Sequence, residues 1–286
     1  MTPPAWMKTH QTREFSNRDW ICRSDDGCGI ERLEAFFQGH GYDAHRHDSY
    51  AIGITLSGVQ SFNYRKDTRY SLPGTTMIIH PDEIHDGAAG TSEGFLYRIA
   101  YIQPELLQQV LGHAQLPFVK NGICNDPRLY SAARLLLADI AAQPDALERD
   151  DRLLDLVIGL QSVSDARKQQ HRGDFRAAQA AREYIHDKID SVVTLQELAN
   201  ISHRDRWSLS RDFRYYFGTS PYRYLTMRRL DLVKRLMIGG KSLADSSAIA
   251  GFSDQSHMTR QFAKTYGISP AQWLKIQVPV DNANHL

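Results

Sequence analysis

The stretch DRWSLSRDFRYYFGTSP, residues 205–221, returns in altered form as DQSHMTRQFAKTYGISP at residues 254–270. At an offset of 49 residues the two copies share an Asp, a Leu or Met, a Ser or Thr, an Arg and a Phe, and both end in Gly-x-Ser-Pro. One motif written twice is too short for a solenoid, which needs three or more repeats to bury a core. The repeat therefore predicts two small modules built on the same plan.

Each copy follows a short helical segment and a break of small or polar residues. The preceding segments are TLQELANI at 194–201 and SLADSSAIA at 242–250, and the copies open with Asp205 and Asp254. Aspartate is a favoured N-cap because its carboxylate accepts hydrogen bonds from the unpaired N–H groups of the first helical turn. Two short helices joined by a tight turn form a helix-turn-helix, whose second helix can enter the major groove of DNA.

The second helix of each unit has two faces. Leu209 with Phe213, and Met258 with Phe262, are four residues apart and are predicted to point into a core. The outward positions carry Arg, Gln and hydroxyl side chains, which bind base edges and phosphates. They are Arg206, Trp207, Ser210, Arg211, Gln255, Ser256, Thr259 and Arg260. Two alternatives stay open: these polar faces are simply solvated, and Trp207 packs in a core instead of contacting DNA.

The charge of the chain is unevenly distributed, although its net value is only +1. Residues 1–173 carry 18 basic and 22 acidic side chains, whereas residues 174–286 carry 16 and 11. Within residues 200–235 nine basic side chains stand against three acidic ones. Local positive charge of this kind predicts an anionic partner, most commonly nucleic acid, with a solvated helical face as the alternative.

The C-terminal segments resemble the AraC/XylS family of bacterial transcription regulators. The segment AIAGFSDQSHMTRQFAKTYGISPAQWLK, residues 248–275, is similar to the family's second helix-turn-helix signature, and LQELA, LSRDFRYYFGTSPYRYL and MRRLDLVKRL are similar to its first unit and connecting helix. The resemblance covers about residues 174–276. It implies two helix-turn-helix units joined by one long helix around residues 220–238. Carried over by position, it adds His257 to the outward residues named above.

Three positions depart from the family pattern. The first turn normally holds Gly and then an apolar residue, but this chain has His203 and Arg204 there. A positive φ costs His more than Gly, so that turn is expected to be strained or reoriented. Ser246 occupies a core position that is usually aliphatic. Both departures bear on how firmly each unit is packed.

The N-terminal half has the pattern of a β domain. With 286 residues, 42% of them hydrophobic, the chain is long enough for two domains. Short apolar runs between turn signals predict strands over residues 40–105, and helical stripes follow from residue 127 to residue 163. The segment SDARKQQHRGD at 164–174 is the predicted linker. No signal peptide or membrane helix is expected, so the cytoplasm is the predicted location, and three cysteines without CxxC spacing are expected to be reduced thiols.

The stretches HRHDSYAIGITLSG (45–58) and SLPGTTMIIHPDEIHDG (71–87) resemble the cupin-like sensor domain that often precedes such a DNA-binding domain. His45 and His47 are two apart, so on a strand both point to one face, and His85 could approach them in a small barrel. Three interpretations stay open: a ligand pocket, structural histidines, or a metal site. Catalytic cupins usually add a Glu after HxH, which is missing here. Tyr50 and Tyr97 are the other predicted ligand-binding residues.

Together these features predict an α+β multidomain chain: an N-terminal cupin-like β-barrel with following helices, and a C-terminal all-α double helix-turn-helix. The predicted domains are a sensor at 1–120, a helical dimerisation region and linker at 121–173, and a DNA-binding domain at 174–286. The predicted function is an effector-responsive transcription regulator, an activator by resemblance. Its expected partners are double-stranded promoter DNA, a small-molecule effector, a second copy of the chain and RNA polymerase. No catalytic residue, cofactor, metal or membrane contact is predicted. The alternatives are a cupin-type metal-binding enzyme or metal sensor, and a helical protein-interaction module.

Overall fold

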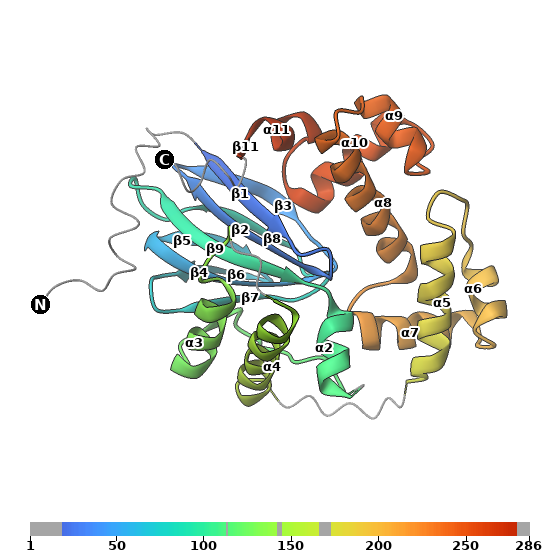
Figure 1. Ribbon diagram of the computed structural model, residues 1–286, viewed down its shortest axis with the longest axis horizontal. Coiled ribbons are helices and arrows are strands. Elements are labelled where there is room, and N and C mark those ends of the chain that lie inside the picture. Colours follow the sequence, from blue (N-terminus) through green and yellow to red (C-terminus); the bar gives the residue numbers. More distant parts are fainter. Residues whose placement is uncertain (1–18, 113, 142–144, 166–172, 279–286) are drawn as a thin grey trace, which may run out of the picture.

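A computed structural model describes residues 19–112, 114–141, 145–165 and 173–278 of the chain. Most of the predicted linker, residues 164–174, lies outside the described residues. Figure 1 shows a two-sheet body on one side and an arc of helices on the other.

Two β-sheets form the N-terminal body. A seven-stranded sheet has the order β10-β7-β4-β9-β2-β1-β11, and a four-stranded sheet has the order β3-β8-β5-β6. All pairings are antiparallel except that of β1 with β11. The strands are β1 (Trp20–Asp25), β2 (Ile30–Phe37), β3 (His40–His45), β4 (Tyr50–Gly58), β5 (Gln60–Tyr64), β6 (Asp67–Ser71), β7 (Thr76–Ile79), β8 (His85–Ala89), β9 (Phe95–Ile102), β10 (Ile123–Cys124) and β11 (Gln277–Val278).

The predicted β region is confirmed but begins earlier, at Trp20 instead of residue 40. Strand β2 lacks a clear alternation of apolar and polar residues in the sequence, because some of its buried positions carry charged side chains. Glu34 is 2% exposed and accepts a hydrogen bond from Arg98 Nε on the neighbouring strand at 2.5 Å. A buried carboxylate is tolerated where such a partner satisfies it.

Alternation along the strands produces two separate cores. Phe37, Phe62 and Tyr97 belong to the cluster enclosed between the sheets. Side chains on the other face of the large sheet, such as Ile52, pack instead against helices α2 (Pro104–Leu111), α3 (Pro127–Leu136) and α4 (Ala146–Ser162). Because β4 is covered on both faces, it reads as a continuous apolar run.

The helical part contains the two predicted helix-turn-helix units. Its helices are α5 (Phe175–Asp187), α6 (Leu195–Ile201), α7 (Arg206–Phe217), α8 (Pro221–Ile238), α9 (Leu243–Ile249), α10 (Gln255–Tyr266) and α11 (Pro270–Lys275). Figure 1 shows α8 running from the unit of α5–α7 to the unit of α9–α11, as the connecting helix predicted around 220–238. The units have separate cores, one around Leu209 and Phe213 and one around Met258 and Phe262.

The three departures from the family pattern have structural consequences. His203 has a φ of 50°, the left-handed conformation that Gly251, at φ 76°, provides in the second unit. Arg204 forms a 2.8 Å ion pair with the fully buried Asp212. Ser246 is fully buried, and its hydroxyl has no hydrogen-bond partner among the described residues.

The helical part docks directly on the β body. Strand β11, after α11, pairs in parallel with β1, and Ile21 N donates to Ile276 O at 3.1 Å. Asp43 N donates to Gly267 O at 3.1 Å, and Arg46 N donates to Lys264 O at 3.2 Å. Strand β11 therefore completes the edge of the large sheet. Within the described residues, every helix is too short or too polar to span a bilayer.

Candidate DNA-reading surface and effector cavity

The nine side chains predicted to contact DNA lie on the outer sides of α7 and α10. Leu209, Phe213, Met258 and Phe262 are fully buried beneath them, as the two-face pattern predicts. Trp207 is 66% exposed, so the core alternative for this residue is wrong. The exposed members of the nine are Arg206, Trp207, Arg211, Gln255, Ser256 and Arg260, and the half-buried ones are Ser210, His257 and Thr259.

Both helices are capped as predicted. The Asp205 carboxylate accepts hydrogen bonds from the N–H groups of Trp207 and Ser208, and Asp254 accepts one from His257 N at 2.6 Å. These bonds fix the first turn, which is the part of a recognition helix that approaches base edges. We call α7 and α10 the recognition helices below.

The positive charge found between residues 200 and 235 is only partly at this surface. Arg223 and Lys234 form ion pairs with residues of the β body, Asp82 at 2.6 Å and Glu31 at 2.9 Å. Arg228 binds Asp48 there at 2.9 Å. The charge therefore serves two interfaces, with Arg206, Arg211 and Arg214 left on the exposed side of α7.

A cavity of about 520 Å³ lies between the β body and the helical part. Its walls come from strands β1–β3 and β9 and helix α2 on one side, and from α5, α8, α10 and α11 on the other. Charged side chains of both signs line it. They are Arg23, Asp25, Glu31, Asp48, Glu105, Arg182, Arg228, Asp231, Lys234 and Arg235. With five cationic and five anionic groups, the lining carries no net charge.

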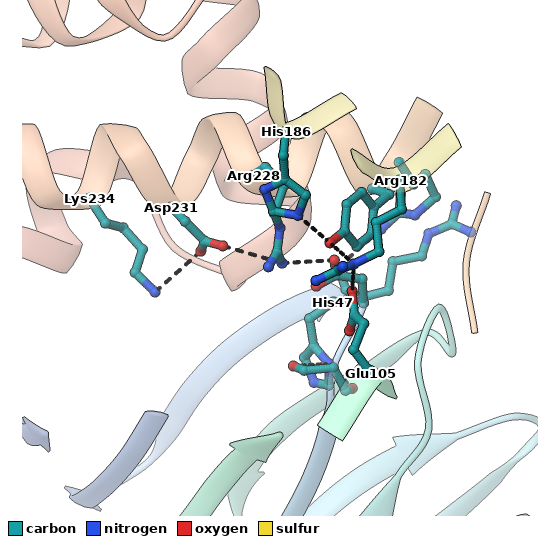
Figure 2. Close-up of polar contacts among 12 residues, drawn as sticks. His47, Glu105, Arg182, His186, Arg228, Asp231 and Lys234 are labelled. Carbon is teal, nitrogen blue, oxygen red and sulfur yellow. Dashed lines mark hydrogen bonds and ion pairs between the residues drawn. The ribbon is translucent and has the colours of Figure 1, made fainter. Parts of the chain in front are cut away.

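Figure 2 shows the polar network on the helical wall, with Arg228, Asp231 and Lys234 projecting from consecutive turns of α8. Burial opposes ionisation of Glu31, but Arg23 and Lys234 together outweigh it and lower its pKa to about 2. Burial raises the pKa of Asp48 to about 6, against the attraction of Arg228. Nearby, Glu105 accepts a hydrogen bond from Arg182 Nε at 2.9 Å.

The three predicted histidines meet beside this cavity, where His45 and His47 belong to the lining and His85 packs against both rings. The ring centroid of His85 lies 4.2 Å from that of His45 and 4.8 Å from that of His47. Each Nδ1 forms a hydrogen bond with a backbone carbonyl. The partner of His45 is Asp43 O at 2.7 Å, that of His47 is Ser49 O at 2.8 Å, and that of His85 is Glu83 O at 3.0 Å. Since a carbonyl only accepts, each Nδ1 carries the proton and each Nε2 keeps a lone pair.

These imidazoles are held neutral. Burial lowers the pKa of His45 to about 4 and that of His47 to about 3, and it lowers the pKa of His85 well below its usual range. The Nε2 of His47 has no hydrogen-bond partner among the described residues, although the side chain is 4% exposed and lines the cavity. The group can accept a proton donor from a ligand. Within the described part of the chain, no cluster of His, Cys, Asp or Glu is arranged to hold a metal ion.

The predicted tyrosines take different places. Tyr97 lies one layer behind the cavity and donates its hydroxyl to Tyr42, a lining residue, at 3.1 Å. Tyr50 faces the helices on the other side of the large sheet, where its hydroxyl donates to Pro117 O at 2.8 Å. Tyr50 therefore lies away from the cavity. The structure adds Tyr101, whose ring lies 5.1 Å from His47.

The charged cavity residues were missed by sequence reasoning because half of them come from the helical part. The spacing of Arg228, Asp231 and Lys234 on one face of α8 was the available signal. Three charges at intervals of three residues on the connecting helix indicate a face that meets a partner surface.

Both recognition helices end against the β body at the same point of the repeat. Gly218 and Gly267 cap α7 and α10 with φ of 71° and 70°. A Cβ added at Gly218 would lie 2.6 Å from Pro81 Cβ, and one at Gly267 would lie 2.8 Å from Asp43 O and 2.9 Å from His45 Nδ1. The cap of α10 therefore rests directly on a cavity histidine.

Comparison with known proteins relates both parts of the chain to one kind of protein. The family model described as an AraC-like ligand binding domain matches residues 27–157, and a helix-turn-helix domain model matches residues 198–276. The chain is 25% identical over 229 residues to the uncharacterized HTH-type transcriptional regulator YbfI of Bacillus subtilis, covering 75% of this chain and 80% of that protein.

Two further likenesses extend over most of the chain. It is 26% identical over 246 residues to the HTH-type transcriptional activator RhaS of Pectobacterium carotovorum, covering 80% of this chain and 86% of that one. The fold is similar to that of ToxT from Vibrio cholerae in a structure with an unsaturated fatty acid bound. The TM-score is 0.61 at 12% identity, with 93% of this chain and 98% of that chain covered.

Proposed function

The chain belongs to the AraC-type family of transcription regulators, and we propose that it reads promoter DNA with α7 and α10 under the control of an effector bound in the cavity between its two parts. Like its relatives, it is a DNA-binding regulator and not an enzyme. The metal-dependent enzyme and the interaction module are therefore not retained. Below, the sensor domain is the described chain up to residue 165, and the DNA-binding domain is residues 173–278.

The single observation that carries the DNA-reading proposal is the outward display of the nine side chains on two capped helices. Arg211 and Arg260 occupy equivalent positions in the repeat and are both exposed. Arginine binds guanine O6 and N7 with two hydrogen bonds, and glutamine at position 255 suits adenine. Two equivalent helices joined through α8 would enter successive major-groove segments on one side of the duplex.

The effector proposed here is polar and uncharged overall. The five cations and five anions of the lining balance one another, and eight of these ten groups are held in ion pairs that a charged ligand would disturb. The free Nε2 of His47 requires a donor such as a hydroxyl, amide or amine, which a carboxylate lacks. His45 and His47 form the donor-binding floor, His85 supports it by packing against both rings, and Tyr97 supports it through Tyr42. The fatty acid bound to ToxT is the contrasting ligand class.

The effector would act through the C-terminal cap of α10. His45 lines the cavity and lies beneath Gly267, so a ligand that moves His45 presses on the end of α10. Ion pairs from α8 to Asp48, Asp82 and Glu31 hold the same interface. A ligand has to favour one docking of the domains over another in order to change DNA affinity.

A homodimer is proposed through α4. Its side chains Leu147, Leu154 and Ile158 are 73%, 44% and 55% exposed. Spaced by seven and four residues, they lie on one stripe of the helix, which favours a helix-to-helix contact between copies. Activation, with RNA polymerase as a partner and the cytoplasm as the location, is proposed from the likeness to RhaS, an activator.

The experiment that tests the function is selection of 30-bp duplexes from a random pool by the full chain. We expect enrichment of one sequence pattern, and weaker binding of it when Arg211 and Arg260 are both replaced by Ala. The effector class is tested by measuring the thermal unfolding midpoint of the chain with neutral polyols, amides and fatty acids of equal carbon number. A midpoint raised by fatty acids alone would contradict the neutral-ligand proposal.

A further inference from the structure

Away from α8, the two helix-turn-helix units meet where a loop of the first unit touches the turn of the second. The loop of residues 188–193 joins α5 to α6, and Gly251 lies in the turn between α9 and α10. A Cβ added at Gly251 would lie 2.7 Å from Asp190 O. This backbone-to-backbone approach needs glycine both for space and for its φ of 76°.

One side chain of α8 reaches both sides of this contact. Arg229 donates from Nε to Ile189 O and from Nη2 to Ser191 O, each at 2.7 Å. On its other side, the guanidinium carbon lies 6.0 Å from the ring centroid of Phe252, in the turn of the second unit. The planar guanidinium offers two donors in a fixed fork, which a lysine ammonium does not reproduce.

The contact bears on the geometry of DNA reading because the units have separate cores. A shared helix fixes their distance along α8, while side contacts fix the rotation of the remaining helices about it. Successive base pairs are only about 3.4 Å apart. A small rotation of one recognition helix therefore changes which base pairs it meets. We propose that Arg229 is a positioning residue that fixes the rotation of α7 and α10 relative to each other about α8, and thereby the spacing between the two DNA elements that the chain reads.

This inference rests on the proposed reading of DNA by both helices, and one experiment tests it. The full-length wild type and the variant Arg229→Gln each select from a random pool of 30-bp duplexes, and the distance between enriched sequence blocks is compared. The wild type is expected to enrich two blocks at one distance and to lose about tenfold in affinity on a 1-bp insertion. For the variant, neighbouring distances are expected to bind within about threefold of one another, with the block sequences unchanged.

Lys241→Gln is the matched control, because it also removes one positive charge near the end of α8. Lys241 is exposed, and its side chain forms no hydrogen bond or ion pair with another described residue. It should keep the single spacing. Arg229→Lys keeps the positive charge but loses the planar pair of donors. This variant replaces Arg229→Gln in the experiment if Arg229→Gln does not fold. The inference is overturned if the folded variants retain one sharp spacing, or if affinity falls equally at every spacing with a smaller salt slope, as for a phosphate contact. If the wild type enriches no pair of blocks, the proposed function fails together with it.

Discussion

The arginines between residues 200 and 235 have different structural roles. Arg211 faces outward, Arg228 pairs with a sensor carboxylate, and Arg229 binds carbonyls of a neighbouring loop. Composition predicted a basic surface, but it could not distinguish these roles, because the partners of Arg228 and Lys234 lie 180 and 203 positions away in the chain. The spacing of charges along α8 indicates a face that meets a partner surface, but local sequence does not identify the partner residues.

The outward arginines should carry sequence preference. Replacing Arg211 or Arg260 by Ala is expected to cost about 1 to 3 kcal/mol at the selected duplex, because each would lose a two-bond contact with guanine. The free energy of unfolding should change by less than about 0.5 kcal/mol, since both side chains are exposed. Competition binding against random DNA checks the claim: equal losses on both duplexes would identify phosphate contacts instead.

The histidine cluster should make stability depend on pH. The folded pKa values of His45 and His47, about 4 and about 3, lie below the unfolded value near 6.5. Their contribution is therefore present above pH 6.5 and lost as the pH falls from there towards 4, because the unfolded chain binds more protons. Asp48, with its pKa raised to about 6, acts in the opposite direction over about pH 4 to 6, but it is one group against three.

We therefore expect the thermal midpoint to fall between pH 7 and pH 5. In the double variant His45→Gln, His47→Gln this fall should be smaller. His40→Gln is the control, because His40 is exposed and lies outside the cavity. An unchanged pH profile in the double variant would show that the cluster does not titrate on unfolding.

At the scale of elements, the repeat predicted both helix-turn-helix units, because capping residues and apolar spacing are local signals, and the family resemblance predicted the connecting helix. Strands β1 and β2 were missed, since β2 buries charged residues whose partner strand is distant in sequence. The cavity wall on α8 was missed for the same reason. Tyr50 was assigned to the ligand because it lies on a barrel strand, but on β4 both faces are covered and it points to the helices.

The unusual first turn should depend on its ion pair. Arg204→Ala is expected to destabilise the chain by about 2 kcal/mol, because it leaves the fully buried Asp212 carboxylate without its 2.8 Å partner; the figure is below the usual range because Arg204 is one-third exposed. Arg206→Ala, two residues on and exposed, should change stability by less than about 0.5 kcal/mol. Urea unfolding of the two variants compares them, and similar midpoints would contradict a structural role for Arg204.

At the scale of the whole molecule, the two Gly-x-Ser-Pro caps are also docking points. Gly218→Ala and Gly267→Ala are each expected to cost more than Gly240→Ala. All three residues have positive φ, but only the first two would place a Cβ against the sensor domain, whereas nothing lies within 4 Å of Gly240. The strain alone should cost about 1 kcal/mol.

Urea unfolding of the three glycine variants gives this comparison. Replacing Pro81 by Gly should recover part of the loss at Gly218 and none of the loss at Gly267, since Pro81 contacts only the first cap. Equal losses for all three variants would mean that the caps matter for their helices alone and not for docking.

The central claim is that two recognition helices read DNA from one side, and hydroxyl-radical footprinting of the full chain on its selected duplex tests it most directly. We predict two protected stretches on the same face, with centres about one helical turn, roughly 10 bp, apart. The variant Arg211→Ala should weaken protection of one stretch, and Arg260→Ala that of the other. A single protected stretch, or loss of the same stretch in both variants, would contradict the account.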